Sequence, residues 1–255
     1  MSTRISILTL ILICSQFFAL TDCYCQNSIT DRSNYIKENL LVNENNIPLD
    51  TSLLYFPLEL FPRFSYTNDS IDSTATAAWM SIEGSDTSIM YSQIRPNEFD
   101  TFRIKWYSKH LYALNEPLLY NKLTTKETYR FTWLRTFHNP VVIRIEKSNN
   151  NYMLYWKVCN GAGGYSPGKL KKNKQKKISL DDWNGFNNLL DSIDYWNIKK
   201  TGALIFCDGA RWILEGSTRD KYYVIDIQSP NEANAYYKVC DYLIQLTGLK
   251  IKEKY

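Results

Sequence analysis

Two stretches of alternating side chains, joined by a short polar segment, constrain the fold of this chain more than any other feature. In Val141–Lys147 an aliphatic residue recurs at every second position, and charged residues alternate with the later ones. The polar residues 148–151 follow, and the alternation resumes in Tyr152–Val158. Strict alternation is typical of a strand with one buried face, and an Asn-rich connection is typical of a hairpin. The sequence therefore predicts an antiparallel hairpin over 141–158.

Three further strands are expected. The aromatic-rich stretch Tyr129–Thr136 precedes the first hairpin, and a second hairpin is formed by Arg211–Glu215 and Tyr222–Ile227 around the polar turn 216–221. Because consecutive strands joined by short turns pair antiparallel, these segments predict one antiparallel sheet.

Three helices are predicted around the strands. The first has an apolar stripe at three- and four-residue steps, ended by Pro117, and its members are Phe99, Phe102, Trp106, His110 and Leu114. Ser179 with Asp182 predicts a capping box at the start of the second. For the third helix we expect Ser229 as the N-cap, Pro230 as the first helical residue and Glu232 as the second member of a capping box. Gly248 is expected to end this helix. Its buried stripe is formed by Ala233, Tyr236, Cys240 and Leu243. The order of elements indicates an α+β fold, an antiparallel β-sheet built from hairpins with helices packed on one face.

The N-terminus predicts export. Arg4 precedes an apolar run, Ile5–Leu20, which is shorter than the roughly 20 residues that span a bilayer. We expect a signal peptide in residues 1–25, cleaved before Gln26 or before Asp22, and a periplasmic or secreted product; lipid anchoring through Cys23 and retention as an anchor are the alternatives. An extended, partly ordered segment is expected over 26–97, and the α+β domain over 98–255.

The composition excludes a disordered or fibrous chain. A net charge of +4 from 30 basic and 26 acidic residues, with 44% hydrophobic residues, fits a globular chain and favours no partner by charge alone.

The cysteines allow little cross-linking. Cleavage before Gln26 leaves Cys159, Cys207 and Cys240, so at most one disulfide forms, and its pairing stays open. Their spacing matches no metal site, and we expect neither a metal nor a cofactor.

Two adjacent segments carry candidate binding residues. Residues 160–168 are glycine-rich, and Gly163, Gly164 and Tyr165 are candidates for ligand contact, although a wide loop between strands is the simpler explanation. Six lysines follow within residues 169–177, among them the candidates Lys171 and Lys172. They fit either a solvated edge strand or a polyanion-binding strand. A nucleic-acid partner is unlikely, because no aromatic residue lies inside the run.

Catalysis is not indicated. His110 is expected to be packed and hydrogen-bonded, and His138, in a turn entering a strand, is the better functional candidate. Neither a G-x-S-x-G nor an H-E-x-x-H motif is present. Asp208 lies in a turn ahead of Arg211, Trp212 and Glu215, which complete the candidate site. We expect Glu215 to pair with Arg130, Arg135 or Arg144 on other strands, and Arg130 and Arg135 are also candidate binding residues.

Over about residues 107–249 the chain resembles a family of exported bacterial proteins with no assigned activity. The residues that carry the resemblance are Tyr107-Ser108, Leu114, Glu116-Pro117, Tyr129-Arg130-Phe131, Trp133-Leu134-Arg135, Phe137-His138-Asn139-Pro140, Gly161-Ala162-Gly163-Gly164-Tyr165, Pro167-Gly168, Asp208-Gly209-Ala210, Trp212-Ile213-Leu214-Glu215-Gly216, Asp226 and Ser229-Pro230. The family often has a His before the second strand of the last hairpin and an Arg-Trp after its Asp. Here these neighbourhoods read Tyr222-Tyr223-Val224 and Ile227-Gln228, so a catalytic role for that His does not carry over. The resemblance implies an exported bacterial protein with one main domain, and no substrate.

These observations favour an exported, non-enzymatic domain that binds a protein or an envelope polymer, such as an anionic one. The alternative is a hydrolase acting on glycans or peptides, in which His138 works with Asp208, Glu215 or Glu146. This alternative requires a carboxylate within hydrogen-bond reach of His138, or a carboxylate pair in a cleft.

Overall fold

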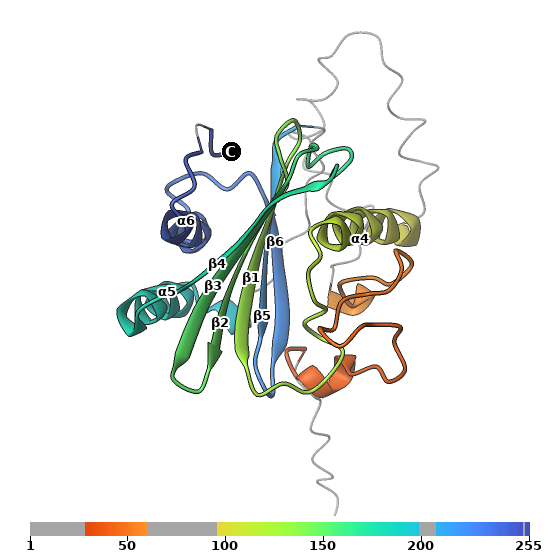
Figure 1. The fold of residues 1–255 in the computed structure, drawn as a ribbon, viewed down its shortest axis with the longest axis horizontal. Helices are drawn as coiled ribbons and strands as arrows, with labels where there is room; N and C mark the ends of the chain where they lie inside the picture. The colour runs from red at the N-terminus through yellow and green to blue at the C-terminus, as the bar shows by residue number, and fades with distance from the viewer. Residues whose placement is uncertain (1–28, 61–95, 199–207, 252) are drawn as a thin grey trace, which may run out of the picture.

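A single antiparallel sheet organises the chain. The computed structural model describes residues 29–60, 96–198, 208–251 and 253–255. The strands are β1 (Glu127–Arg135), β2 (Val141–Ser148), β3 (Asn151–Cys159), β4 (Leu170–Lys177), β5 (Ala210–Ser217) and β6 (Tyr222–Gln228). They lie in the order β4-β3-β2-β1-β5-β6 (Figure 1). Both predicted hairpins and the aromatic-rich strand are confirmed.

The helices lie on both sides of this sheet. Helices α5 (Leu180–Ser192) and α6 (Ala235–Thr247) pack on one face, as expected, whereas α4 (Pro96–Ala113) and residues 29–60 lie on the opposite face (Figure 1). The α+β fold is confirmed, and the first predicted helix forms a second layer of its own. Three short 3₁₀ helices complete the described elements: Arg32–Tyr35, Leu58–Leu60 and Tyr195–Asn197.

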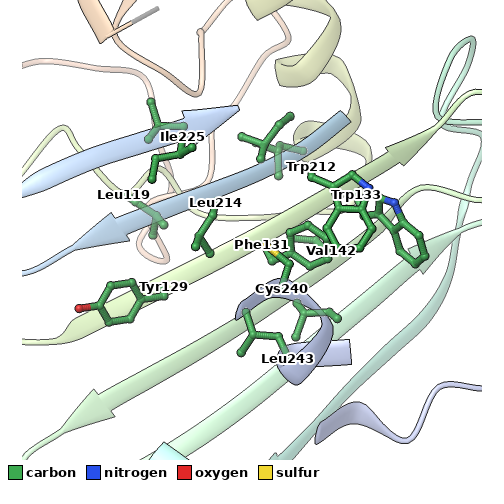
Figure 2. Close-up of a cluster of buried hydrophobic side chains, with 14 of the residues drawn as sticks. Leu119, Tyr129, Phe131, Trp133, Val142, Trp212, Leu214, Ile225, Cys240 and Leu243 are labelled. Carbon is green, nitrogen blue, oxygen red and sulfur yellow. The ribbon is translucent and has the colours of Figure 1, made fainter. Parts of the chain in front are cut away.

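The apolar core lies between the sheet and helices α5 and α6. Phe131, Trp133 and Trp212 point from the central strands toward α6, which contributes Cys240 and Leu243 (Figure 2). All five side chains are fully buried. Burial of large aromatic side chains supplies much of the hydrophobic stabilisation of such a layer.

The helix ends follow the predicted chemistry in two of three cases. Ser179 and Asp182 form the expected capping box, and Gly248 ends α6 with φ of +69°. The N-cap of α6 is Asn234, so the prediction of Ser229 is wrong. The Ser229 hydroxyl instead accepts the N–H of Ala210, which fixes the start of β5. Helix α6 therefore starts later, and Ala233, expected in its stripe, is exposed ahead of it.

The stripe predicted for α4 is partly wrong. His110 and Leu114 are buried as expected, but Phe102 is exposed, and the side chain of Phe99 lies outside the described residues. Arg103 and Tyr107 are buried in its place because both reach Asp226 on the sheet. The buried side of the helix thus combines these polar contacts with the aliphatic residues Ile104 and Leu111.

Arg32 is one of the residues that attach residues 29–60 to the rest of the molecule. Its buried guanidinium donates to the carbonyl oxygens of Leu119, Lys122 and Thr218 and to the Ser217 hydroxyl. The predicted signal peptide, Cys14, Cys23, Cys25 and Cys207 lie outside the described residues. Within those residues, Cys159 and Cys240 are buried free thiols, and no helix is long and apolar enough to cross a membrane.

Candidate functional site

The lysine run forms an outer strand of the sheet. Among the described strands, β4 pairs with β3 alone, and all eight of its residues are exposed. The exposed-edge interpretation of this segment is confirmed. Across the described part of the chain, none of the six lysines of 169–177 takes part in an ion pair. Their charges therefore face solvent without an acidic neighbour in contact.

The register of β4 places three of these lysines in one row. Val158 pairs with Lys172, Trp156 with Lys174 and Leu154 with Lys176. Because alternate residues of a strand share a face, these lysines lie on the same side, about 7 Å apart along the strand at a rise of roughly 3.4 Å per residue. We call Lys172, Lys174 and Lys176 the lysine row. Asn173, Gln175 and Lys177 share the opposite face.

The two edges of the sheet differ. At the β6 edge, Tyr222 donates its N–H to the carbonyl of Thr30, and Asp31 forms a bridge with Lys221. Strand β6 contains no lysine. The N-terminal segment thus covers part of the β6 edge, whereas β4 keeps its outer side exposed.

A layer of buried ions lies on the opposite side of the sheet from α5 and α6. The Arg130 guanidinium contacts the Glu215 carboxylate at 2.6 Å, and both side chains are fully buried. The hydroxyl of Tyr222 donates to the same carboxylate at 2.8 Å. Burial raises the pKa of Glu215, and Arg130 and Tyr222 oppose that rise. Of the three arginines expected as partners of Glu215, Arg130 is the one that contacts it.

Three cations surround Glu116 in the same layer. Its carboxylate lies 2.9 Å from Arg144 Nε, 2.8 Å from Lys157 Nζ and 3.7 Å from Arg130 Nη1. Burial acts to raise the pKa of Glu116, but these cations outweigh it, so the pKa lies below its usual value. Arg144 also pairs with Glu146. Glu116 therefore links β1, β2 and β3 through their charged residues.

Asp226 is the third anionic centre. Arg211 approaches it at 2.6 Å, the hydroxyl of Tyr107 donates to it at 2.8 Å, and Arg103 lies 3.6 Å away. These contacts attach α4 to β5 and β6. The ion layer consists of Arg103, Glu116, Arg130, Arg144, Glu146, Lys157, Arg211, Glu215 and Asp226. Because Glu116, Glu215 and Asp226 each contact cations from other elements, the layer joins α4 and the strands to one another.

His138 lies away from the acidic residues proposed for it. Its Nδ1 is 2.6 Å from the hydroxyl of Tyr255, and its Nε2 is 3.7 Å from the carboxylate of Glu253. Glu215 and Glu146 belong to the ion layer. Asp208 is exposed and lies two residues before the start of β5. His110 is fully buried and bonded to the carbonyl of Trp106 at 2.9 Å, as expected. Burial lowers its pKa.

The glycine-rich loop packs against the end of β1. A Cβ at Gly163 would lie 2.6 Å from backbone atoms of Arg135, and one at Gly164 would lie 2.9 Å from Thr136. The carbonyl of Gly163 accepts the indole N–H of Trp106 at 2.9 Å. These glycines therefore permit close backbone packing. Tyr165 is exposed beside Phe137.

The sequence-predicted residues fall into separate places. Arg130, Arg211 and Glu215 share the ion layer, and Lys171 and Lys172 lie on β4. Arg135, His138 and Trp212 meet at the tail 253–255. Sequence reasoning missed Glu116 and Asp226 as centres of the ion layer. The one available signal for Asp226 was its charge within an otherwise apolar and aromatic strand.

Within the described residues, no group of three or more His, Cys, Asp or Glu side chains is arranged to hold a metal ion. Comparison with protein-family models and with curated proteins gives no match to this chain. The resemblance to exported bacterial proteins thus remains a prediction.

Proposed function

We propose that this chain is an exported, non-enzymatic domain that binds a linear anionic polymer along β4. The observation that carries the proposal is the lysine row, three cations at equal spacing on an exposed strand, without acidic partners. Lysines on a sheet edge also guard it against aggregation. Six charges of one sign within nine residues additionally attract a polyanion.

The buried charges strengthen this assignment. Arg130, Arg144, Lys157 and Arg211 all contact carboxylates. The lysines of 169–177 contact no carboxylate of the residues that the structure describes, so they supply cations to an external partner. A linear polymer that carries an anionic group about every 7 Å would match the spacing of this row.

The hydrolase alternative draws little support from the geometry. His138 contacts Tyr255 and Glu253, and none of its three proposed acidic partners is in contact with it. Export remains part of the proposal and is supported by the sequence of residues 1–25. Intact mass of the protein recovered from an exporting bacterial host tests it: loss of the residues before Gln26 or Asp22 supports export, and an unprocessed chain contradicts cleavage.

Binding to dextran sulfate, with uncharged dextran as the control ligand, tests the polymer proposal. The variant Lys172→Gln, Lys174→Gln, Lys176→Gln removes the lysine row. At about 1 kcal/mol for each basic residue near an anionic surface, it should weaken binding roughly a hundredfold. The matched variant Lys105→Gln, Lys109→Gln, Lys238→Gln removes three exposed lysines of α4 and α6.

This control variant should bind nearly as well as the wild type. Binding should also disappear in about 1 M salt, where charges are screened within about 3 Å. Equal weakening by the two triple variants would show that net charge alone drives binding and would contradict the assignment to β4. Absence of any binding to dextran sulfate would contradict the proposal and favour a protein partner.

A further inference from the structure

The tail formed by Glu253, Lys254 and Tyr255 lies against the end of the central strands. The main-chain oxygen of Tyr255 accepts two hydrogen bonds, from the indole Nε1 of Trp133 at 3.2 Å and of Trp212 at 2.9 Å. Both tryptophans are fully buried. Two indole N–H groups from different strands therefore converge on one main-chain oxygen.

Two further polar side chains complete the surroundings of the tail. Arg135 donates from Nη1 to the carbonyl oxygen of Glu253 at 3.1 Å, and its guanidinium lies 4.2 Å from the centre of the Trp133 ring. His138 bonds the hydroxyl of Tyr255 at 2.6 Å. We call Trp133, Arg135, His138 and Trp212 the tail site.

The sheet side of this site offers mainly donors. An indole has only an N–H donor and a guanidinium has no acceptor, so an occupant must present oxygen atoms. A buried donor left without a partner costs about 1–3 kcal/mol. The tail meets this requirement with main-chain carbonyl groups, which any extended peptide also carries.

The tail does not use every donor. Arg135 is 6% exposed, and its buried Nε has no hydrogen-bond partner within the described residues. Glu253 directs its carboxylate toward His138 at 3.7 Å and is largely exposed. A ligand that placed a carboxylate on Arg135 would satisfy the remaining donor, since guanidinium binds carboxylate through paired N–H groups.

Apart from these hydrogen bonds, Tyr255 packs against the apolar core, and its ring meets His138 edge-on. Residues 253–255 pair with none of the described strands. Lys254 forms an ion pair with Asp241 of α6. The strands pair with one another and not with the tail, so release of the tail would break no strand pairing.

We propose that the tail site is a peptide-binding site which residues 253–255 occupy within their own chain. Its external ligand is an extended peptide that carries a tyrosine for His138 and a carboxylate for Arg135. The inference is independent of polymer binding along β4, because no residue is shared between the two sites.

The test uses the full chain and a fluorescently labelled peptide of residues 250–255, Lys-Ile-Lys-Glu-Lys-Tyr. The variant Tyr255→Ala weakens the intramolecular occupant. It should bind the peptide at least tenfold more tightly than the wild type, because the site is free in a larger fraction of molecules. The same peptide ending in Ala should bind at least tenfold more weakly.

Trp212→Phe and Arg135→Gln, each combined with Tyr255→Ala, should reduce binding at least tenfold, whereas Lys238→Gln should not. A folded Tyr255→Ala variant that fails to bind, or that binds both peptides equally, overturns the proposal. Should this variant fail to fold, fluorescence anisotropy of the labelled peptide with the wild type provides the readout. Saturable binding that Arg135→Gln weakens at least tenfold supports the proposal, and the absence of saturable binding overturns it. If the wild type is a dimer and the Tyr255→Ala variant is a monomer, the tail of one copy occupies the tail site of the other. That result would overturn occupancy within one chain.

Discussion

Arg130 and Glu215 face each other on neighbouring strands with a 2.6 Å contact between guanidinium and carboxylate, and neither side chain is exposed. Removing one member leaves the other charge buried without its partner, which typically costs about 3–5 kcal/mol. Arg130→Met and Glu215→Leu should each lower the free energy of unfolding by about that amount, measured by urea denaturation.

The double variant should lose less than the sum of the two single losses, with a coupling of about 1–3 kcal/mol. It should not regain wild-type stability, because the Tyr222 hydroxyl and the carbonyl of Pro117 lose their partners. Strictly additive losses would contradict a direct interaction between the two charges.

The sequence predicted the strands better than the ion layer, for a physical reason. Alternation reports which face of a strand is buried, so the β2–β3 hairpin was predictable from Val141–Val158. The partner of a buried charge depends instead on the fold. Glu116 follows α4 in the sequence, yet it meets Arg144 and Lys157 on two later strands.

Two other predictions were wrong for the same reason, that the contact depends on the fold and not on the local sequence. Phe102 suits an apolar stripe, but α4 turns Arg103 toward Asp226, a contact that helical periodicity does not encode. Ser229 is a good N-cap residue, but its hydroxyl is taken by the N–H of Ala210. The lysine run and its candidates Lys171 and Lys172 were predicted from local sequence, whereas the row of Lys172, Lys174 and Lys176 became apparent only from the register of β4.

Acid should weaken the fold through Glu116. Its pKa in the folded chain lies below the ordinary 4.5 of the unfolded chain, so its ionised form contributes stability above that pH. This contribution is lost as pH falls through the folded pKa. Glu116→Gln should therefore lower the free energy of unfolding at pH 7 by about 3–5 kcal/mol.

The difference between wild type and Glu116→Gln should shrink as the pH drops below about 4.5. Denaturant titrations at a series of pH values measure it. The control Glu232→Gln removes an exposed carboxylate and should leave stability at pH 7 nearly unchanged. A pH-independent difference for Glu116→Gln would contradict the assigned role of its charge.

Gly163→Ala should be more damaging than Gly248→Ala. At Gly163 a Cβ would lie 2.6 Å from the backbone of Arg135, and overpacking of this kind costs about 3 kcal/mol. At Gly248 the space is open, and only the positive φ of +69° opposes alanine, at about 1 kcal/mol. Thermal or urea unfolding of both variants gives the comparison. Equal losses would mean that the glycine-rich loop does not pack on β1 as described.

Polymer binding along the lysine row is tested most directly by moving one charge while keeping the composition. Lys174→Gln combined with Gln175→Lys leaves net charge and residue content unchanged, but it transfers the middle lysine of the row to the opposite face of β4. The measurement is the dissociation constant for dextran sulfate at low ionic strength. Loss of one contact of about 1 kcal/mol should weaken binding about fivefold. An unchanged dissociation constant would contradict the row as the binding element.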